Sequence, residues 1–146
     1  MNRTKTATRI LSVLAALFLL LASLTACSGG VTREETKTAM DALLTALDNE
    51  NYAEAAALYH PDAAMTEELL AAFAEQVKTK VGIDLTEGAV VEKITGISTS
   101  YYDSNVDGSR YALTAKIKAG DKTADLTVEV IRNDKGYGIF QVECNP

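Results

Sequence analysis

The sequence predicts an α+β fold, in which N-terminal helices pack on one face of a curved, cone-like, four-stranded antiparallel sheet. Up to about residue 82, apolar residues after the leader recur at the spacing of a helix. From about residue 88 they alternate with polar residues instead, which is typical of strands with one buried face. The connections between the alternating segments are short, and short connections favour an antiparallel meander.

The first helix is expected over 33–47. Thr32 and Glu35 have the spacing of a capping box, which satisfies backbone N–H groups at a helix start. An apolar stripe then follows at helical spacing and should face the core; it consists of Met40, Leu43, Leu44 and Leu47.

Two further helices are expected before the sheet. Asn51 and Glu54 repeat the capping-box spacing, and the His60-Pro61 pair should end the second helix because a residue before proline avoids the helical region. Thr66 should begin the third helix, and Gly82 is placed to stop it. Its expected apolar side comprises Leu69, Leu70, Phe73, Val77 and Val81.

Four strands are expected, over about 89–99, 110–118, 125–130 and 137–144. Gly96 is a candidate bulge in the first. The second should bury Tyr111, Leu113, Ala115 and Ile117, and the third should bury Leu126, Val128 and Val130. Polar and glycine-containing segments at 119–122 and 133–136 have the composition of turns.

The first 26 residues have the pattern of a secretory signal peptide. The first nine carry three basic residues and no acid, and residues 10–24 form an uncharged, apolar run. The run ends in Leu24-Thr25-Ala26-Cys27, which resembles the lipobox of bacterial lipoproteins. That resemblance implies cleavage between Ala26 and Cys27, fatty acylation at Cys27, and attachment to the cell membrane on the extracytoplasmic side.

This interpretation divides the chain into a signal peptide (1–26), a lipidated cysteine with its tether (27–31) and one domain (32–146). An uncleaved transmembrane anchor is the alternative, because no charge occurs from Ile10 to Thr32. The apolar run is shorter than the roughly 20 residues of a typical membrane span, and Ser28-Gly29-Gly30 would be a poor helix end inside lipid.

Charge and cysteine content limit the classes of partner. The whole chain has a net charge of −6, and removal of the basic leader makes the domain more acidic. Without clustered lysine and arginine, the domain is not expected to bind nucleic acid.

If Cys27 is lipidated, Cys144 has no partner for an intramolecular disulfide; a 27–144 disulfide would require an unprocessed Cys27. Cys144 is otherwise expected to be a small buried residue of the last strand rather than a reactive thiol.

The segment 44–56 (LTALDNENYAEAA), followed by His60-Pro61-Asp62-Ala63, resembles small lipoproteins of the nuclear-transport-factor-2-like superfamily, which includes SnoaL-like and cystatin-like domains. The resemblance implies a cone-like α+β domain. Such a fold hosts binding proteins as well as small enzymes with an acid–base pocket, so the fold does not fix the function.

One motif suggests a metal ion. Asp103, Asn105 and Asp107, followed by Gly108, match the start of a calcium loop. The twelfth position is Thr114 where such loops need a bidentate Glu, so the motif predicts either a plain turn or a weak calcium site. No other cofactor is expected.

His60, the single histidine, is expected at the surface of a helix end and not as a catalytic base. No catalytic residue is assigned. The sequence therefore favours a membrane-anchored, non-enzymatic domain that binds a protein or a small apolar ligand. The alternative is a small SnoaL-like enzyme.

Overall fold

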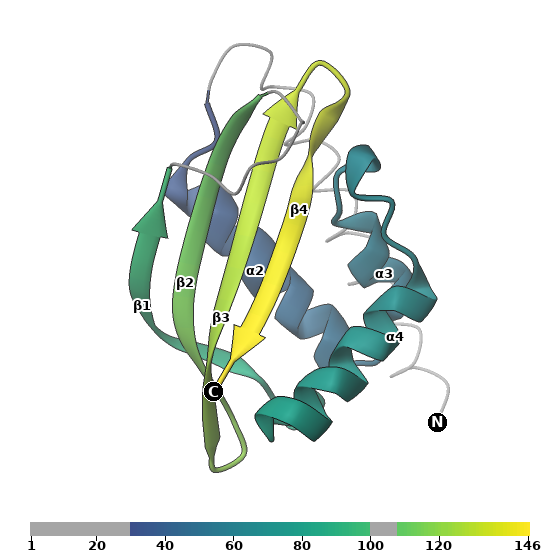
Figure 1. The fold of residues 1–146 in the computed structure, drawn as a ribbon, viewed down its shortest axis with the longest axis vertical. Coiled ribbons are helices and arrows are strands. Elements are labelled where there is room, and N and C mark those ends of the chain that lie inside the picture. Colours follow the sequence, from purple (N-terminus) through teal and green to yellow (C-terminus); the bar gives the residue numbers. More distant parts are fainter. Residues whose placement is uncertain (1–29, 100–107) are drawn as a thin grey trace, which may run out of the picture.

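The computed structural model describes residues 30–99 and 108–146. Three α-helices come first: α2 (Arg33–Asp48), α3 (Tyr52–Ala57) and α4 (Glu67–Gln76). A 3₁₀ turn, η1 (Pro61–Ala63), precedes α4, and a π-helical turn, η2 (Val77–Val81), continues it. The strands are β1 (Val90–Ser98), β2 (Ser109–Ala119), β3 (Lys122–Asn133) and β4 (Gly136–Asn145). They form one antiparallel sheet in the order β1-β2-β3-β4, so the predicted α+β meander is confirmed (Figure 1).

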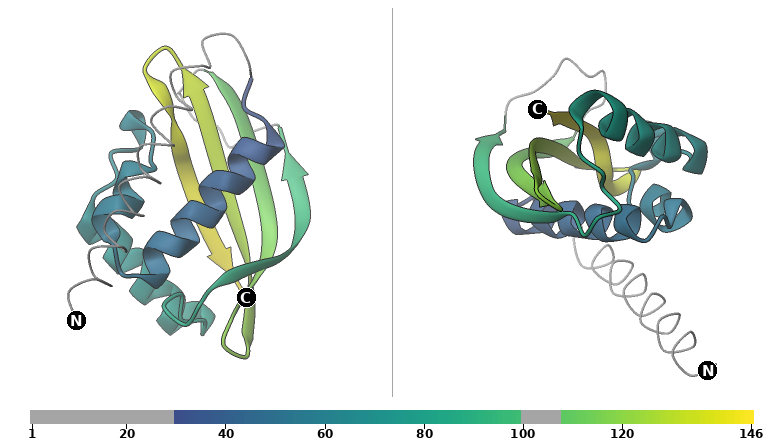
Figure 2. Two further views of the ribbon diagram at one scale, coloured as in Figure 1. Left: turned by 180° about the vertical axis from the view of Figure 1, so that it is seen from behind. Right: turned by 90° about the horizontal axis from the view of Figure 1, so that it is seen from below.

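The helix α2 begins at the predicted capping box. The Thr32 hydroxyl accepts a hydrogen bond from the Glu35 N–H, and the Glu35 carboxylate accepts one from the Thr32 N–H. The helix crosses the sheet diagonally (Figure 2, left). Its predicted apolar stripe, Met40, Leu43, Leu44 and Leu47, is at most 2% exposed. Local sequence signals therefore determine both the start and the buried side of this helix.

The central strands β2 and β3 pair in continuous register, from Ser109 opposite Arg132 to Ala119 opposite Lys122. Their predicted alternation is confirmed for the core side except at Tyr111, which is only partly buried, and it breaks down at residues 128–131 of β3, which are buried in succession. Leu113, Ala115 and Ile117 of β2 are fully buried. Leu126, Val128 and Val130 of β3 are at most 1% exposed.

The edge strand β1 is irregular. Its register with β2 shifts between Val91 and Lys93, and again between Ile94 and Gly96, beside the glycine expected to mark a bulge. Val90 and Ile97 are 57% and 55% exposed, so β1 adds less to the core than β2 and β3 do.

The segment after α3 extends the sheet beyond β4. Tyr59 forms an isolated parallel bridge with Ile139: the His60 N–H donates to the Ile139 carbonyl (2.8 Å), and the Ile139 N–H donates to the Leu58 carbonyl (2.9 Å). Gly138 permits this close approach, because a Cβ there would lie 2.4 Å from the His60 nitrogen.

The third helix differs from the expectation. Leu70 and Val77 are buried, but Leu69 is 54% exposed. Because α4 packs against α3 and continues into η2 beside β4, only a narrow side of it is covered. The prediction that Leu69 faces the core was wrong.

The helices cover one face of a curved sheet, as predicted (Figure 2, right). The space between the two layers is filled mainly by leucine, isoleucine, valine and alanine side chains. Within residues 30–99 and 108–146, no helix is long and apolar enough to cross a membrane.

Candidate functional site

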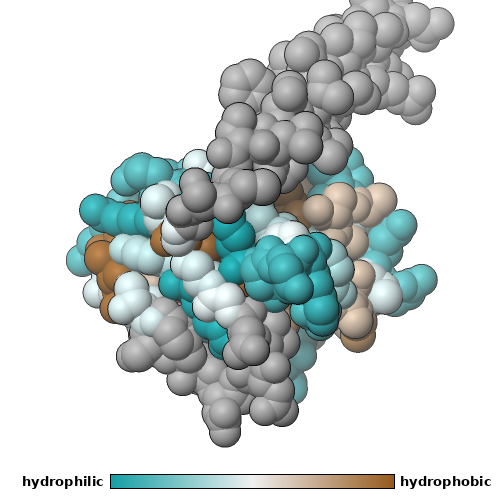
Figure 3. All heavy atoms as spheres, turned by 90° about the horizontal axis from the view of Figure 1, so that it is seen from above, coloured by the Kyte–Doolittle hydropathy of each residue, from teal (hydrophilic) through white to brown (hydrophobic). Residues whose placement is uncertain are grey.

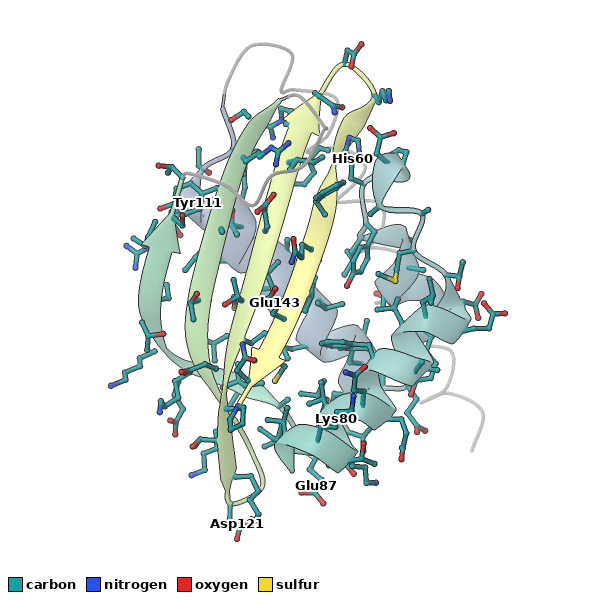
Figure 4. The ribbon with its side chains drawn as sticks, in the orientation of Figure 1. His60, Lys80, Glu87, Tyr111, Asp121 and Glu143 are labelled. Atoms are coloured by element: carbon teal, nitrogen blue, oxygen red, sulfur yellow. The ribbon has the colours of Figure 1, made fainter. Side chains whose placement is uncertain are left out.

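A groove of about 440 Å³ lies between α4 and η2 on one side and the end of β4 on the other. Its apolar lining consists of Phe73, Val77, Val81, Val142, Cys144 and Pro146. The polar lining residues are Gln76, Lys80, Glu143 and Asn145. Lys80 on η2 and Glu143 on β4 can be located in Figure 4. Buried Val77 and exposed Gln76, Lys80 and Asn145 indicate an apolar bottom with a polar rim.

The helical wall of the groove is not a regular α-helix. After Gln76 the chain forms the π-helical turn η2, and Gly82 ends it in the left-handed conformation (φ 84°) with its N–H bonded to the Val77 carbonyl. Single π-helical turns are frequent at functional sites because they redirect side chains. Periodicity predicted Phe73 and Val81 as core residues, but both are only partly buried and line the groove.

An ion pair connects η2 to the segment that follows it. Lys78 Nζ lies 2.7 Å from an Asp84 carboxylate oxygen, and the other carboxylate oxygen accepts hydrogen bonds from the Thr86 N–H and hydroxyl. The hydrogen bonds from Lys78 and Thr86 lower the pKa of Asp84 to about 2. These polar contacts lie outside the groove and join η2 to the segment that follows it.

Cys144 is half-buried in β4 and faces the groove, close to the expectation of a small buried residue. Burial, together with the nearby Asp125 carboxylate, raises the pKa of the thiol to about 11. Because the thiolate is the nucleophilic form, the thiol is a poor nucleophile at neutral pH. Its role in the groove is therefore that of an apolar surface.

His60 is not at the surface, so that prediction was wrong. The residue is 1% exposed because its backbone pairs with β4 through Gly138 and Ile139. Its Nδ1 accepts a hydrogen bond from the Asp62 N–H (3.1 Å), and its Nε2 lies 2.9 Å from Asn133 Oδ1.

These contacts define the tautomer of His60. Asn133 Oδ1 also accepts from the Lys135 N–H, which identifies that atom as an acceptor. Nε2 therefore carries the proton and Nδ1 does not. The imidazole joins η1 to the β3–β4 turn, and it is not among the residues that line the groove.

The sheet face turned away from α2 carries a second group of polar residues. Arg110 Nη1 and Glu129 Oε1 are 3.6 Å apart, with side chains 7% and 3% exposed. The Arg110 guanidinium lies 6.0 Å from the centroid of the Phe140 ring. Burial raises the pKa of Glu129, and the charge of Arg110 opposes that rise. The sequence does not predict this buried pair, because Arg110 and Glu129 alternate with apolar residues along β2 and β3 and are therefore expected to face solvent.

The residues predicted to be modified or to bind metal lie outside the described part of the chain. These are Ala26 and Cys27, at the predicted cleavage and lipidation site, and Asp103, Asn105 and Asp107 of the calcium-like motif. In the two described ranges, no group of three or more histidine, cysteine or acidic residues is arranged to hold a metal ion.

Comparison of the chain with protein-family models, curated proteins and solved structures found no match.

Proposed function

We propose that this chain is a lipid-anchored, extracytoplasmic protein of the cell membrane whose domain binds a ligand without catalysing a reaction. The observation that carries the binding role is the groove beside β4. Its volume of about 440 Å³ is in the range of small-molecule sites, and its lining offers both apolar and polar side chains to a ligand.

The interior of the domain also supports binding over catalysis. An acid–base enzyme of the SnoaL-like kind needs polar groups that converge in an open pocket between helices and sheet. In this domain aliphatic side chains fill that space. The buried imidazole of His60 is engaged by Asp62 and Asn133. We therefore propose that the domain is related to the nuclear-transport-factor-2-like superfamily. We propose binding, and not catalysis, as its activity.

The groove should accept an apolar molecule, and 1-anilinonaphthalene-8-sulfonate is a suitable fluorescent probe. We expect it to perturb the NMR signals of Val77, Lys80 and Cys144. Val81→Trp should abolish the effect, because the indole would occupy the groove. Leu69→Trp places the same side chain on an exposed position of α4 and is the matched control. Equal binding by both variants, or perturbations centred elsewhere, would contradict the assignment.

The anchor has a separate test. Cys27→Ser should prevent cleavage after Ala26 and lipid attachment, because the cysteine sulfur accepts the lipid in the family that the leader resembles. Each buried CH₂ contributes about 0.8 kcal/mol, so two or more acyl chains give stable attachment. In detergent phase partitioning, the wild-type chain and the Cys144→Ser control should therefore both enter the detergent phase. A Cys27→Ser chain that is still cut after Ala26 and still partitions into detergent would refute the proposal.

A further inference from the structure

Arg132, at the end of β3, holds the start of the described chain against the sheet. One guanidinium nitrogen lies 2.6 Å from a Glu35 carboxylate oxygen of α2, and the other donates to the Gly30 carbonyl (3.2 Å). The guanidinium also lies 4.9 Å from the centroid of the Tyr137 ring. The Arg132 side chain is 13% exposed and its partner Glu35 is 34% exposed, so these contacts lie at the edge of the domain and are partly open to solvent.

Other contacts fix the same segment. The Val31 N–H donates to the Ser109 hydroxyl at the start of β2 (2.8 Å), and Val31 itself is buried. The Tyr137 hydroxyl donates to the Glu35 carbonyl (3.3 Å). The backbone at Gly30 is thus fastened to one end of the domain, where β2 begins, β3 ends and β4 begins. We call this end of the domain, which contains Gly30, Ser109, Arg132 and Asp134, the clamp end.

The number of residues between Cys27 and Gly30 then limits how the domain can sit on the membrane. Three Cα–Cα links separate Cys27 from Gly30, and they span at most about 11 Å when fully extended. The proposed lipidation of Cys27, on which this inference rests, places that residue at the level of the lipid headgroups. A point of the clamp end must therefore stay within that distance of the bilayer.

We infer that the clamp end is the surface that faces the membrane, and that the opposite end of the sheet points away from it. The twelve residues of β3 span about 40 Å, so the β2–β3 turn at Asp121 lies far from the clamp end (Figure 4). The groove lies toward that distal end, because Val142 and Cys144 follow Tyr137 along β4 by about 17 to 23 Å. The groove is consequently open to molecules that arrive from outside the membrane.

The chemistry of the clamp end fits contact with lipid headgroups without insertion. Figure 3 views the molecule from this end, where hydrophilic described residues are interspersed with a few apolar ones. Lys135 in the β3–β4 turn pairs with Asp62 at 3.1 Å. The orientation is therefore imposed by the short tether and not by attraction to anionic lipid, so it should persist at high salt, where the Debye length falls to about 3 Å.

The test uses the full-length protein, produced with its leader and reconstituted into phosphatidylcholine vesicles that carry a nitroxide on the headgroup. In a Cys144→Ser background, a fluorophore is attached to Asp134→Cys at the clamp end or to Asp121→Cys at the distal turn; both positions are exposed. We expect quenching to be several-fold stronger at position 134 than at position 121, both at low salt and in 1 M NaCl.

A longer tether provides the matched control. Fifteen Gly/Ser residues inserted between Gly29 and Gly30 leave every described contact intact and add about 21 Å of mean reach. The difference between the two positions should then largely disappear. Flotation of the protein with the vesicles tests the lipid anchor separately from the orientation of the domain. A chain that floats with the vesicles but is quenched equally at both positions overturns the orientation alone. A chain that does not float overturns both the anchor and the orientation.

Discussion

Gly138→Ala should lower the free energy of unfolding by about 3 kcal/mol. The new methyl group would lie 2.4 Å from the His60 nitrogen and 2.6 Å from the Tyr59 carbonyl carbon. Both are backbone atoms, so the strand and the 58–60 segment must separate. Separation costs the two backbone hydrogen bonds that join Leu58 and His60 to Ile139. Urea unfolding of a soluble chain of residues 28–146 would measure the change.

Gly96→Ala is the matched control for this experiment. It makes the same substitution in another strand of the sheet. Its new Cβ would meet Thr114 side-chain atoms at 3.4 and 3.6 Å, which are ordinary contact distances. Its effect should stay within about 0.5 kcal/mol. Similar stability of the two variants would show that β4 and the 58–60 segment are not in the contact described above.

Leu43→Ala should also destabilise the domain by about 3 kcal/mol, because it removes a fully buried side chain and leaves a cavity. Leu69→Ala makes the same substitution in another helix at a position 54% exposed, and should change stability by no more than about 0.5 kcal/mol. The same unfolding experiment measures both. A large loss on Leu69→Ala would mean that α4 buries the side that periodicity suggested and not the side described here.

The features that could be predicted from the sequence depend on neighbours in the chain. The capping box of α2 needs only Thr32 and Glu35, three residues apart, and it forms as expected. The buried faces of β2 and β3 follow from alternation, because successive side chains of a strand point to opposite faces.

The features that could not be predicted depend on residues far apart in the sequence. His60 is buried because Gly138 lets β4 approach it, and a proline after a histidine gives no sign of that partner. Arg132 holds Gly30 across 102 positions. In the groove, Phe73 and Val81 have the periodicity of core residues, and only the π-helical turn and the path of β4 leave them partly open. Helical periodicity indicates which residues are apolar but not how much of the helix a neighbour covers.

The irregular register of β1 affects how the molecule meets copies of itself. An edge strand offers a row of backbone groups to which a strand of another molecule can add, which is a route to aggregation. Two register shifts interrupt that row, and exposed Glu92 and Lys93 place charges beside the first. At the other edge, the Tyr59–Ile139 bridge already occupies part of β4. Val90 and Ile97 can therefore remain exposed on β1 while strand addition there is disfavoured. This would limit self-association if the proposed lipid anchor concentrates copies of the protein on a membrane surface.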